Sequence, residues 1–278
     1  MPSPAKHHMQ QQTDDVTTSV QSPSSPNRRR LIRDNGEKNG NFTGNGTFRY
    51  ANGNNYEGPF LNGCRHGRGY MEYADGSVYK GDWLDDDRHG WGTYQTQAYV
   101  YDGEWIDDQK NGRGLIAYTN GEQYEGQWSR GLPEGIGEYR FKDGSTYIGV
   151  FSQGLRHGRG VLSYGDRVTI YEGDWHRDRK HGNAKITFIN GVYDGSMAND
   201  VKEGHGIYRY NNSDLYEGYW LNNKKHGKGV YHFNGGGFYR GRWVQGQKDG
   251  PGILETSDRV RYAENWVNGK LVMKKRVA

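Results

Sequence analysis

The 278-residue sequence predicts an all-β fold: an elongated, twisted antiparallel meander of tandem β-hairpins, preceded by a disordered N-terminal tail. Three observations predict it. A Tyr-x-Gly motif recurs nine times at steps of 22 to 24 residues, and apolar residues alternate within each copy as on one face of a strand. Asn-Gly and Asp-Gly dipeptides separate the strands. Hydrophobic residues are only 32% of the chain but aromatic residues are 14%, which favours a thin structure with rings packed on backbone.

The first 38 residues differ from the rest of the chain. They contain no aromatic residue, are rich in Gln, Ser, Thr and Pro, and include the basic run Arg28-Arg29-Arg30. This composition predicts a disordered tail over residues 1–38. A degenerate half repeat follows at 39–55, nine repeats of about 23 residues fill 56–261, and a partial repeat with a basic end occupies 262–278.

Each repeat is predicted to contain two strands. The first, for example YEGPF at 56–60, places its Tyr, Gly and second ring on one face, and the second, for example GRGYMEY at 67–73, places two glycines and two apolar residues on that same face. Because glycine has no Cβ, rings can lie against the backbone there. The opposite face of the first strands carries Glu57, Lys80, Asp102, Glu125, Glu172, Asp194, Glu217 and Arg240. One face is therefore apolar and the other solvated.

Short turns are predicted to join the repeats. The dipeptides that indicate them are Asn52-Gly53, Asp75-Gly76, Asn120-Gly121, Asp143-Gly144 and Asn190-Gly191. We expect type I′ turns at these positions, because Asn-Gly and Asp-Gly tolerate the positive φ that this type requires. Connections this short make neighbouring strands pair.

Histidines before Gly-x-Gly raise the possibility of a metal site: His66, His89, His157, His181 and His226. Equivalent positions in adjacent repeats should lie two strand spacings apart, about 10 Å, whereas zinc ligands converge within ~2 Å of one ion. We therefore expect no bound metal, and hydrogen bonding within the loops instead.

No other motif supports catalysis or a cofactor. Asp85-Asp86-Asp87 is expected to be a solvated bend, and Cys64 lies in an exposed loop without a sheltered base. Each Gly-x-Gly leads into a strand and not a helix, so the dinucleotide-binding interpretation fails. The sequence predicts a protein that is not an enzyme.

Charge argues against a nucleic-acid partner. Of the net charge of +4, residues 1–38 carry +2 and residues 270–278 carry +4, which leaves −2 for the middle. The rings could stack bases, but no basic stripe is evident on the folded part. One cysteine, no secretory signal and no long apolar segment indicate an intracellular protein in a reducing compartment.

The half-exposed rings at the end of each second strand are the predicted binding residues. We expect only partial burial there, because a single sheet cannot cover both its faces, and an exposed apolar patch usually marks an interaction site. A partner helix or peptide could occupy it. The predicted partner-binding residues are Tyr118, Phe141, Tyr164, Phe188, Tyr210 and Phe233.

The succession Y-E-G-x-W, H-G-x-G and D-G-x-x-Y resembles the MORN (membrane occupation and recognition nexus) repeat over about residues 40–278. YKGDWLDDDRHGWGTY and YEGYWLNNKKHGKGVYHF look like full copies, whereas Ala184, Met197, Glu264 and Gln97-Ala98-Tyr99 depart from the pattern. The resemblance implies a meander of hairpins. It also implies a member without an enzymatic domain, similar to the radial-spoke-head, ciliary and cytoskeletal proteins of that family.

Two functions follow from the resemblance. The first is a scaffold or adaptor in the cytoplasm that docks protein partners in a cytoskeletal assembly such as a ciliary or flagellar axoneme. The second is a membrane-associated tether that binds anionic phospholipid, which typically requires clusters of four to eight basic residues. Only the two chain ends approach such a cluster, so weak or no lipid binding is expected. Unpaired strand edges at the two ends predict self-association.

Overall fold

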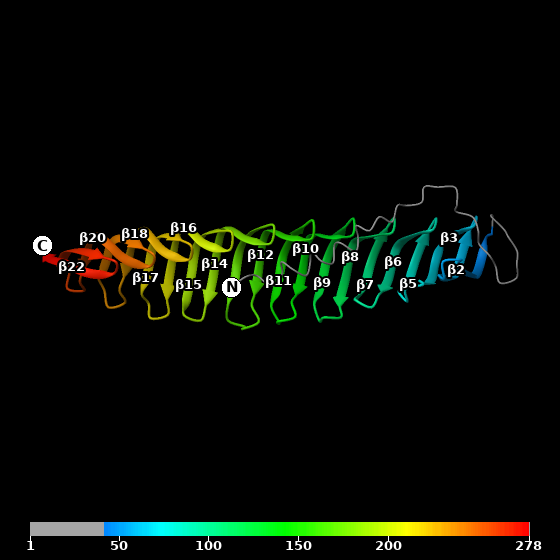
Figure 1. The fold of residues 1–278 in the computed structure, drawn as a ribbon, viewed down its shortest axis with the longest axis horizontal. Coiled ribbons are helices and arrows are strands. Elements are labelled where there is room, and N and C mark those ends of the chain that lie inside the picture. The colour runs from blue at the N-terminus through cyan, green and yellow to red at the C-terminus, as the bar shows by residue number, and fades with distance from the viewer. Residues whose placement is uncertain (1–41, 278) are drawn as a thin grey trace. The chain divides into compact units, whose positions relative to one another are not determined.

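The computed structural model describes residues 42–277, which form 22 β-strands and no helix (Figure 1). The predicted all-β antiparallel meander is confirmed. The predicted tail at 1–38 lies outside the described residues. Within 42–277 there is no helix that could cross a lipid bilayer.

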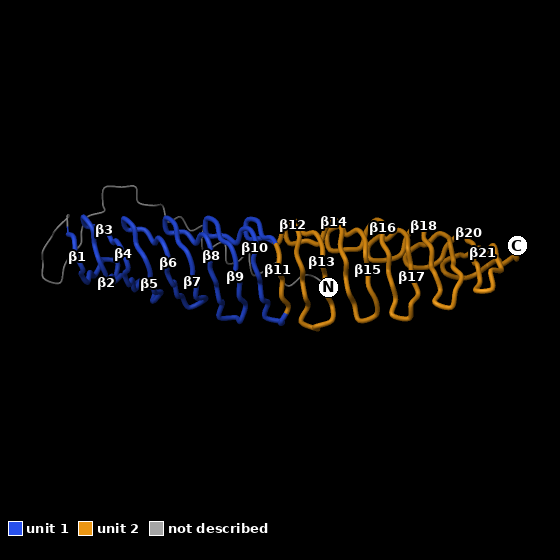
Figure 2. The backbone as a smooth tube through the Cα atoms, turned by 180° about the vertical axis from the view of Figure 1, so that it is seen from behind, with its two compact units in different colours: residues 1–144, 150–155 blue, residues 145–149, 156–278 orange. Residues whose placement is uncertain are grey.

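The described residues divide into two compact units (Figure 2), with residues 42–144 and 150–155 in unit 1 and residues 145–149 and 156–277 in unit 2. The strands of unit 1 are β1 (Gly44–Arg49), β2 (Asn55–Leu61), β3 (Cys64–Arg65), β4 (Gly67–Glu72), β5 (Val78–Leu84), β6 (Asp87–Gln95), β7 (Tyr99–Ile106), β8 (Gln109–Tyr118), β9 (Gln123–Ser129) and β10 (Leu132–Arg140). The strands of unit 2 are β12 (Leu155–Ser163), β13 (Ile170–His176), β14 (Arg179–Phe188), β15 (Gly191–Ala198), β16 (Val201–Tyr210), β17 (Leu215–Leu221), β18 (Lys224–His232), β19 (Phe238–Val244), β20 (Gln247–Glu255), β21 (Arg261–Val267) and β22 (Lys270–Arg276). Strand β11 (Thr146–Ser152) has residues in both units.

Within each unit, successive strands pair antiparallel, and the register is set by glycines. On β5 and β6, Tyr79 lies opposite Tyr94 and Gly81 lies opposite Gly92. On β17 and β18, Tyr216 and Gly218 face their counterparts in the same way. At most first-to-second-strand contacts such a glycine pair leaves a bare stretch of backbone on one face; the exceptions are Gly173 opposite Ala184 and Glu264 opposite Lys274.

The tyrosine of each Tyr-x-Gly motif covers that bare backbone and forms the core. All nine are at most 1% exposed: Tyr56, Tyr79, Tyr101, Tyr124, Tyr147, Tyr171, Tyr193, Tyr216 and Tyr239. Typically the hydroxyl donates to a carbonyl three residues on, as Tyr79 does to Asp82 at 2.9 Å and Tyr193 to Ser196 at 2.8 Å. A buried ring, Trp105 for example, then packs edge-on against the tyrosine. The thin core predicted from composition is thus a layer of rings on glycine backbone.

The predicted type I′ turns lie at the other end of the hairpins. At Asp75-Gly76 only the glycine has positive φ, +79°, and its N–H donates to the Tyr73 carbonyl at 2.9 Å. This is a type I turn followed by a residue in the left-handed region. The Asp75 side chain stabilises the turn by accepting a hydrogen bond from Ser77 N–H at 2.9 Å. The type I′ assignment there was therefore wrong.

Positive φ at two consecutive residues, the requirement for type I′, occurs instead between the two strands of every repeat. The residue pairs are Asn62-Gly63, Asp85-Asp86, Asp107-Asp108, Arg130-Gly131, Gln153-Gly154, Arg177-Asp178, Asn199-Asp200, Asn222-Asn223, Gln245-Gly246 and Asn268-Gly269. Several of these pairs contain no glycine, so the sequence rule did not identify them.

The departures from the repeat pattern are absorbed locally. Ala184 and Met197 are buried, at 5% and 4% exposure, in the positions of the usual glycine and tryptophan. Glu264 replaces a glycine and is 3% exposed, paired with Lys274 at 3.4 Å. In the second copy, the Thr96 hydroxyl closes the turn by accepting from the N–H groups of Ala98 and Tyr99 at 3.1 and 3.0 Å.

Candidate functional site

The ring-bearing face also carries a basic side chain in eight of the nine repeats, which sequence reasoning missed; the fourth repeat has Pro133 at that position. In unit 1 these residues are Arg65, Arg88 and Lys110, and in unit 2 they are Arg156, Lys180, Lys202, Lys225 and Lys248. Each lies over aromatic rings, where the charge is attracted to the ring face. The Arg88 guanidinium carbon is 4.3 Å from the centroid of Trp105, and Lys225 Nζ is 4.7 Å from that of Tyr231.

Strand register produces this row. The basic residue follows the type I′ turn and pairs with the ring that ends the first strand, as Arg88 does with Trp83 and Lys248 with Trp243. It therefore shares a face with that ring and reaches over the corresponding ring of the next repeat, except at Lys180, where Met197 stands in place of that ring. No basic stripe was evident in the sequence, and this row was therefore not predicted. A count of net charge does not reveal its members, although each stands two residues before the first glycine of its Gly-x-Gly, or of Gly-x-Ala for Lys180.

The turn of the following repeat contacts each basic residue. Asp86 N–H donates to the Arg65 carbonyl at 3.1 Å, and Asp86 Oδ1 accepts from Arg65 N–H and Nε at 2.9 and 3.1 Å. Arg88 with Asp108 and Arg156 with Asp178 repeat this arrangement. The supposed solvated bend at Asp85–Asp87 is thus a turn whose second aspartate neutralises an arginine of the preceding repeat.

Replacing Asp178 by Gly should destabilise unit 2 strongly. The Arg156 and Asp178 side chains are only 2% and 9% exposed, and removing one partner leaves a buried charge unpaired, which costs about 3–5 kcal/mol. Because glycine tolerates the positive φ of residue 178, backbone strain does not contribute to the loss of stability. Asp108→Gly is the matched control, because its ion pair is more exposed and should cost about 1 kcal/mol or less. Urea denaturation checks both, and equal losses would contradict the argument.

The six predicted partner-binding rings are all half-buried, as expected. Tyr118 and Phe141 belong to unit 1, and Tyr164, Phe188, Tyr210 and Phe233 belong to unit 2. In unit 2 the structure brings three of them to the lysines. Lys180 donates to the Tyr164 hydroxyl, while Lys202 and Lys225 Nζ each lie 5.4 Å from the centroids of Phe188 and Tyr210, respectively.

Burial among these rings changes the lysines. It lowers the pKa of Lys202 and Lys225 to about 8 and that of Lys110, which also lies near Arg88, to about 7. The physical cause is loss of hydration, which disfavours the charged ammonium. A carboxylate brought against these lysines would restore the charged form.

Three of the five repeat histidines bury their Nδ1 atom without a hydrogen bond among residues 42–277. No three His, Cys, Asp or Glu side chains of residues 42–277 are grouped so as to hold an ion. The Nδ1 atoms of His66, His89 and His226 are buried without a hydrogen-bond partner among those residues, so the predicted loop hydrogen bonding does not form through that nitrogen. Cys64, the single cysteine of the chain, is half-buried.

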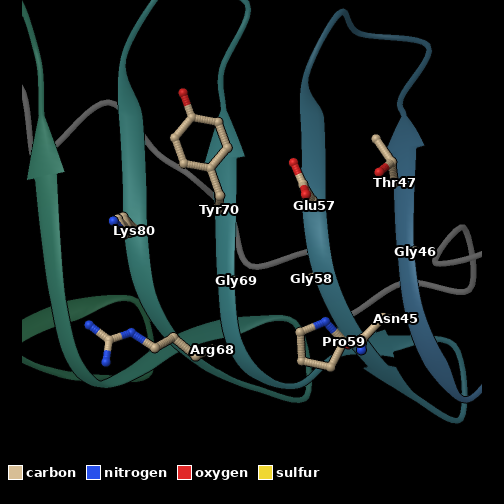
Figure 3. Close-up of a pocket in the computed structure, with 10 residues that line it drawn as sticks. All are labelled: Asn45, Gly46, Thr47, Glu57, Gly58, Pro59, Arg68, Gly69, Tyr70 and Lys80. Carbon is tan, nitrogen blue, oxygen red and sulfur yellow. The ribbon is translucent and has the colours of Figure 1, made fainter.

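The opposite face of unit 1 has an open concavity across β1, β2, β4 and β5 (Figure 3). Figure 3 shows Arg68 and Pro59 at one end and Glu57 and Tyr70 nearer the other, with Lys80 on the neighbouring strand. This mixture of one carboxylate, two cations and a ring, all on open strands, suits a polar contact with another surface.

Three solved structures show limited similarity to the chain. The TCP10 domain of Danio rerio CPAP in complex with a STIL peptide aligns at 14% identity and a TM-score of 0.42, covering 84% of this chain and 94% of that one. The SAS-4 (dCPAP) TCP domain of Drosophila melanogaster, in complex with a proline-rich motif of Ana2, aligns at 18% identity and a TM-score of 0.36, covering 63% and 94%. A further structure of the wild-type TCP10 domain of Danio rerio CPAP aligns at 11% identity and a TM-score of 0.29, covering 83% and 99%. Comparison with curated protein sequences finds no match.

The family model of the MORN repeat matches ten successive segments. They are residues 38–55, 56–78, 79–97, 101–123, 124–146, 147–168, 171–192, 193–215, 216–238 and 239–259. The first match falls on the sequence interpreted as a half repeat. Tandem MORN repeats suggest a protein-binding scaffold. With matches over most of its length and the hairpin meander expected of such repeats, this chain belongs to the MORN-repeat family.

Proposed function

We propose that the protein is a non-catalytic cytoplasmic scaffold that docks other proteins on its ring-bearing face, without metal or cofactor. The observation that carries the proposal is the surface of unit 2, where half-buried rings lie beside half-buried lysines. Aromatic residues dominate the energetics of protein interfaces, and such rings are already ordered by the sheet.

The assembly in which it acts is proposed from the family alone. A chain filled with repeats is similar to the MORN proteins of radial spokes and of the cytoskeleton, so we propose a cytoskeletal assembly, with a ciliary or flagellar axoneme favoured. Self-association through the terminal strands is part of this proposal, because all seven residues of β22 are exposed. The alternative function is a membrane tether, in which the basic row would bind anionic phospholipid.

Replacing Tyr164 and Tyr210 together by Ala should remove partners while the protein stays folded. The two rings are half-exposed, so their loss removes contact surface but not the buried tyrosine layer. Capture of partners from cell extract should fall by about tenfold or more. Trp91→Ala with Tyr219→Ala is the control, since those rings are 50% and 54% exposed on the opposite face, outside the concavity. If the first variant keeps every partner, or both variants lose them equally, docking on this face is wrong.

A further inference from the structure

Three consecutive repeats of unit 2 leave their basic residue without a carboxylate. Lys202, Lys225 and Lys248 form no ion pair with any of residues 42–277, in contrast to Arg65, Arg88 and Arg156. The cause lies in the turn that follows each of them. Its second residue is Asn223, Gly246 or Gly269, respectively, where the arginines meet an aspartate.

The other acidic groups that influence these lysines are already engaged. Asp214, whose charge acts on Lys225, accepts hydrogen bonds from the Tyr231 hydroxyl and from Asn234 N–H, both at 2.7 Å. Glu264, whose charge acts on Lys248, forms an ion pair with Lys274 at 3.4 Å and accepts a hydrogen bond from Trp266 Nε1 at 3.0 Å. Lys202 has no such neighbour and touches the rings of Phe188, Tyr193, Tyr208 and Trp220.

The chain itself shows how a carboxylate fits this row. In the pairs with arginine, the aspartate oxygen lies at 2.9–3.1 Å from the basic side chain, on the surface of the ring layer. The same turn geometry recurs beside the lysines, with φ of +68° at Asn223 and +89° at Gly246 against +78° at Asp86. Half-buried cations that lack this internal carboxylate are complementary to one supplied from outside.

We propose that Lys202, Lys225 and Lys248 bind the carboxylates of an acidic segment of a partner protein, which crosses the strands over the adjoining rings. This rests on the proposed scaffold function and adds the chemistry of the partner. Equivalent lysines are two strand spacings apart, about 10 Å. An extended segment spans that distance in three residues, so the partner carries Asp or Glu at every third position, with apolar residues between them for the rings.

The first test uses a fluorescent synthetic peptide with Glu at every third residue and Leu and Ser between, measured by anisotropy on the full chain. Lys202→Met/Lys225→Met/Lys248→Met should weaken its binding by about tenfold or more. The control is Lys185→Met/Lys224→Met/Lys228→Met, which removes the same charge from exposed positions on the strands and should change binding by less than about threefold. Equal weakening by both variants would overturn the proposal.

The second test restores the internal carboxylates and leaves the lysines intact. Asn223→Asp/Gly246→Asp/Gly269→Asp should pair each lysine with a carboxylate of the chain itself. Binding of the peptide should then weaken by a similar factor. Asn222→Asp/Gln245→Asp/Asn268→Asp places the same three charges one residue earlier in the same turns, where φ is also positive, and should leave binding nearly unchanged. Wild-type affinity in the first of these variants would contradict the proposal.

Two further arms separate the proposal from its alternatives. If vesicles of phosphatidylcholine with 20% phosphatidylserine bind through the three lysines and the peptide does not, the row recognises lipid and the acidic-segment proposal is overturned. If partners captured from extract are lost with Tyr164→Ala/Tyr210→Ala but kept by both the lysine and the aspartate variants, the scaffold function stands and this proposal fails.

Discussion

The protein is expected to unfold steeply near pH 11. Burial raises the pKa of the nine core tyrosines above the usual 10, to about 12 for Tyr239 and higher for the others. A raised folded-state pKa means that the stabilisation is complete below pH 10 and is lost as the pH rises toward the folded value. Each tyrosine then costs about 1.4 kcal/mol per pH unit, so nine cost about 12 kcal/mol, comparable to the whole stability of a typical domain.

The measurement is tyrosinate absorbance and far-ultraviolet circular dichroism across pH 8 to 12. The increase in absorbance from the core tyrosines should coincide with loss of the β signal in one cooperative transition. Replacing the 54%-exposed Tyr219 by Phe should leave the midpoint in place, whereas Tyr101→Phe removes one buried ionisation and should make the transition less steep. A β signal that survives after all tyrosines have ionised would refute the buried layer.

The substitution Gly81→Ala should destabilise unit 1 by about 3 kcal/mol or more. A Cβ at Gly81 would lie 2.4 Å from Gly92 Cα and 2.5 Å from Tyr79 Oη, so either the paired strands or the tyrosine must move. Gly235→Ala is the control, because no heavy atom lies within 4 Å of the added Cβ and φ is ordinary there. Thermal unfolding measures both variants, and similar midpoints would refute the close strand contact.

Gly92, which lies opposite Gly81 on the paired strand, allows the costs of two alanine substitutions to be compared. A Cβ at Gly92 meets the Tyr79 ring at 2.2–2.5 Å and touches no backbone that closely, and the equivalent position in a later repeat is naturally Ala184. Gly92→Ala should therefore cost less than Gly81→Ala. The reverse order would mean that the ring, and not the strand pairing, limits the space.

The period of the Tyr-x-Gly motif was enough to predict strands, faces and the half-exposure of rings such as Tyr164. The sequence pattern did not predict the type I′ turns, because pairs such as Asp85-Asp86 and Arg177-Asp178 contain no glycine. Hydrogen bonds from the preceding repeat to the aspartate at the second position of each pair stabilise these turns. The basic row was not predicted either. Lys225, like most members of the row, stands two residues before the first glycine of Gly-x-Gly, but a count of net charge does not compare equivalent positions of the repeats, and pairing with Trp220 places it on the ring-bearing face.

The contact between each type I′ turn and the preceding repeat has a consequence for synthesis. Arg65 is enclosed only when Trp83 and Asp86, which follow it by 18 and 21 residues, have been made. A repeat leaving the ribosome therefore has an open ring layer until its successor emerges. Folding within a unit must trail translation by about one repeat, and a chain stopped inside a repeat exposes the aromatic rings of the one before it.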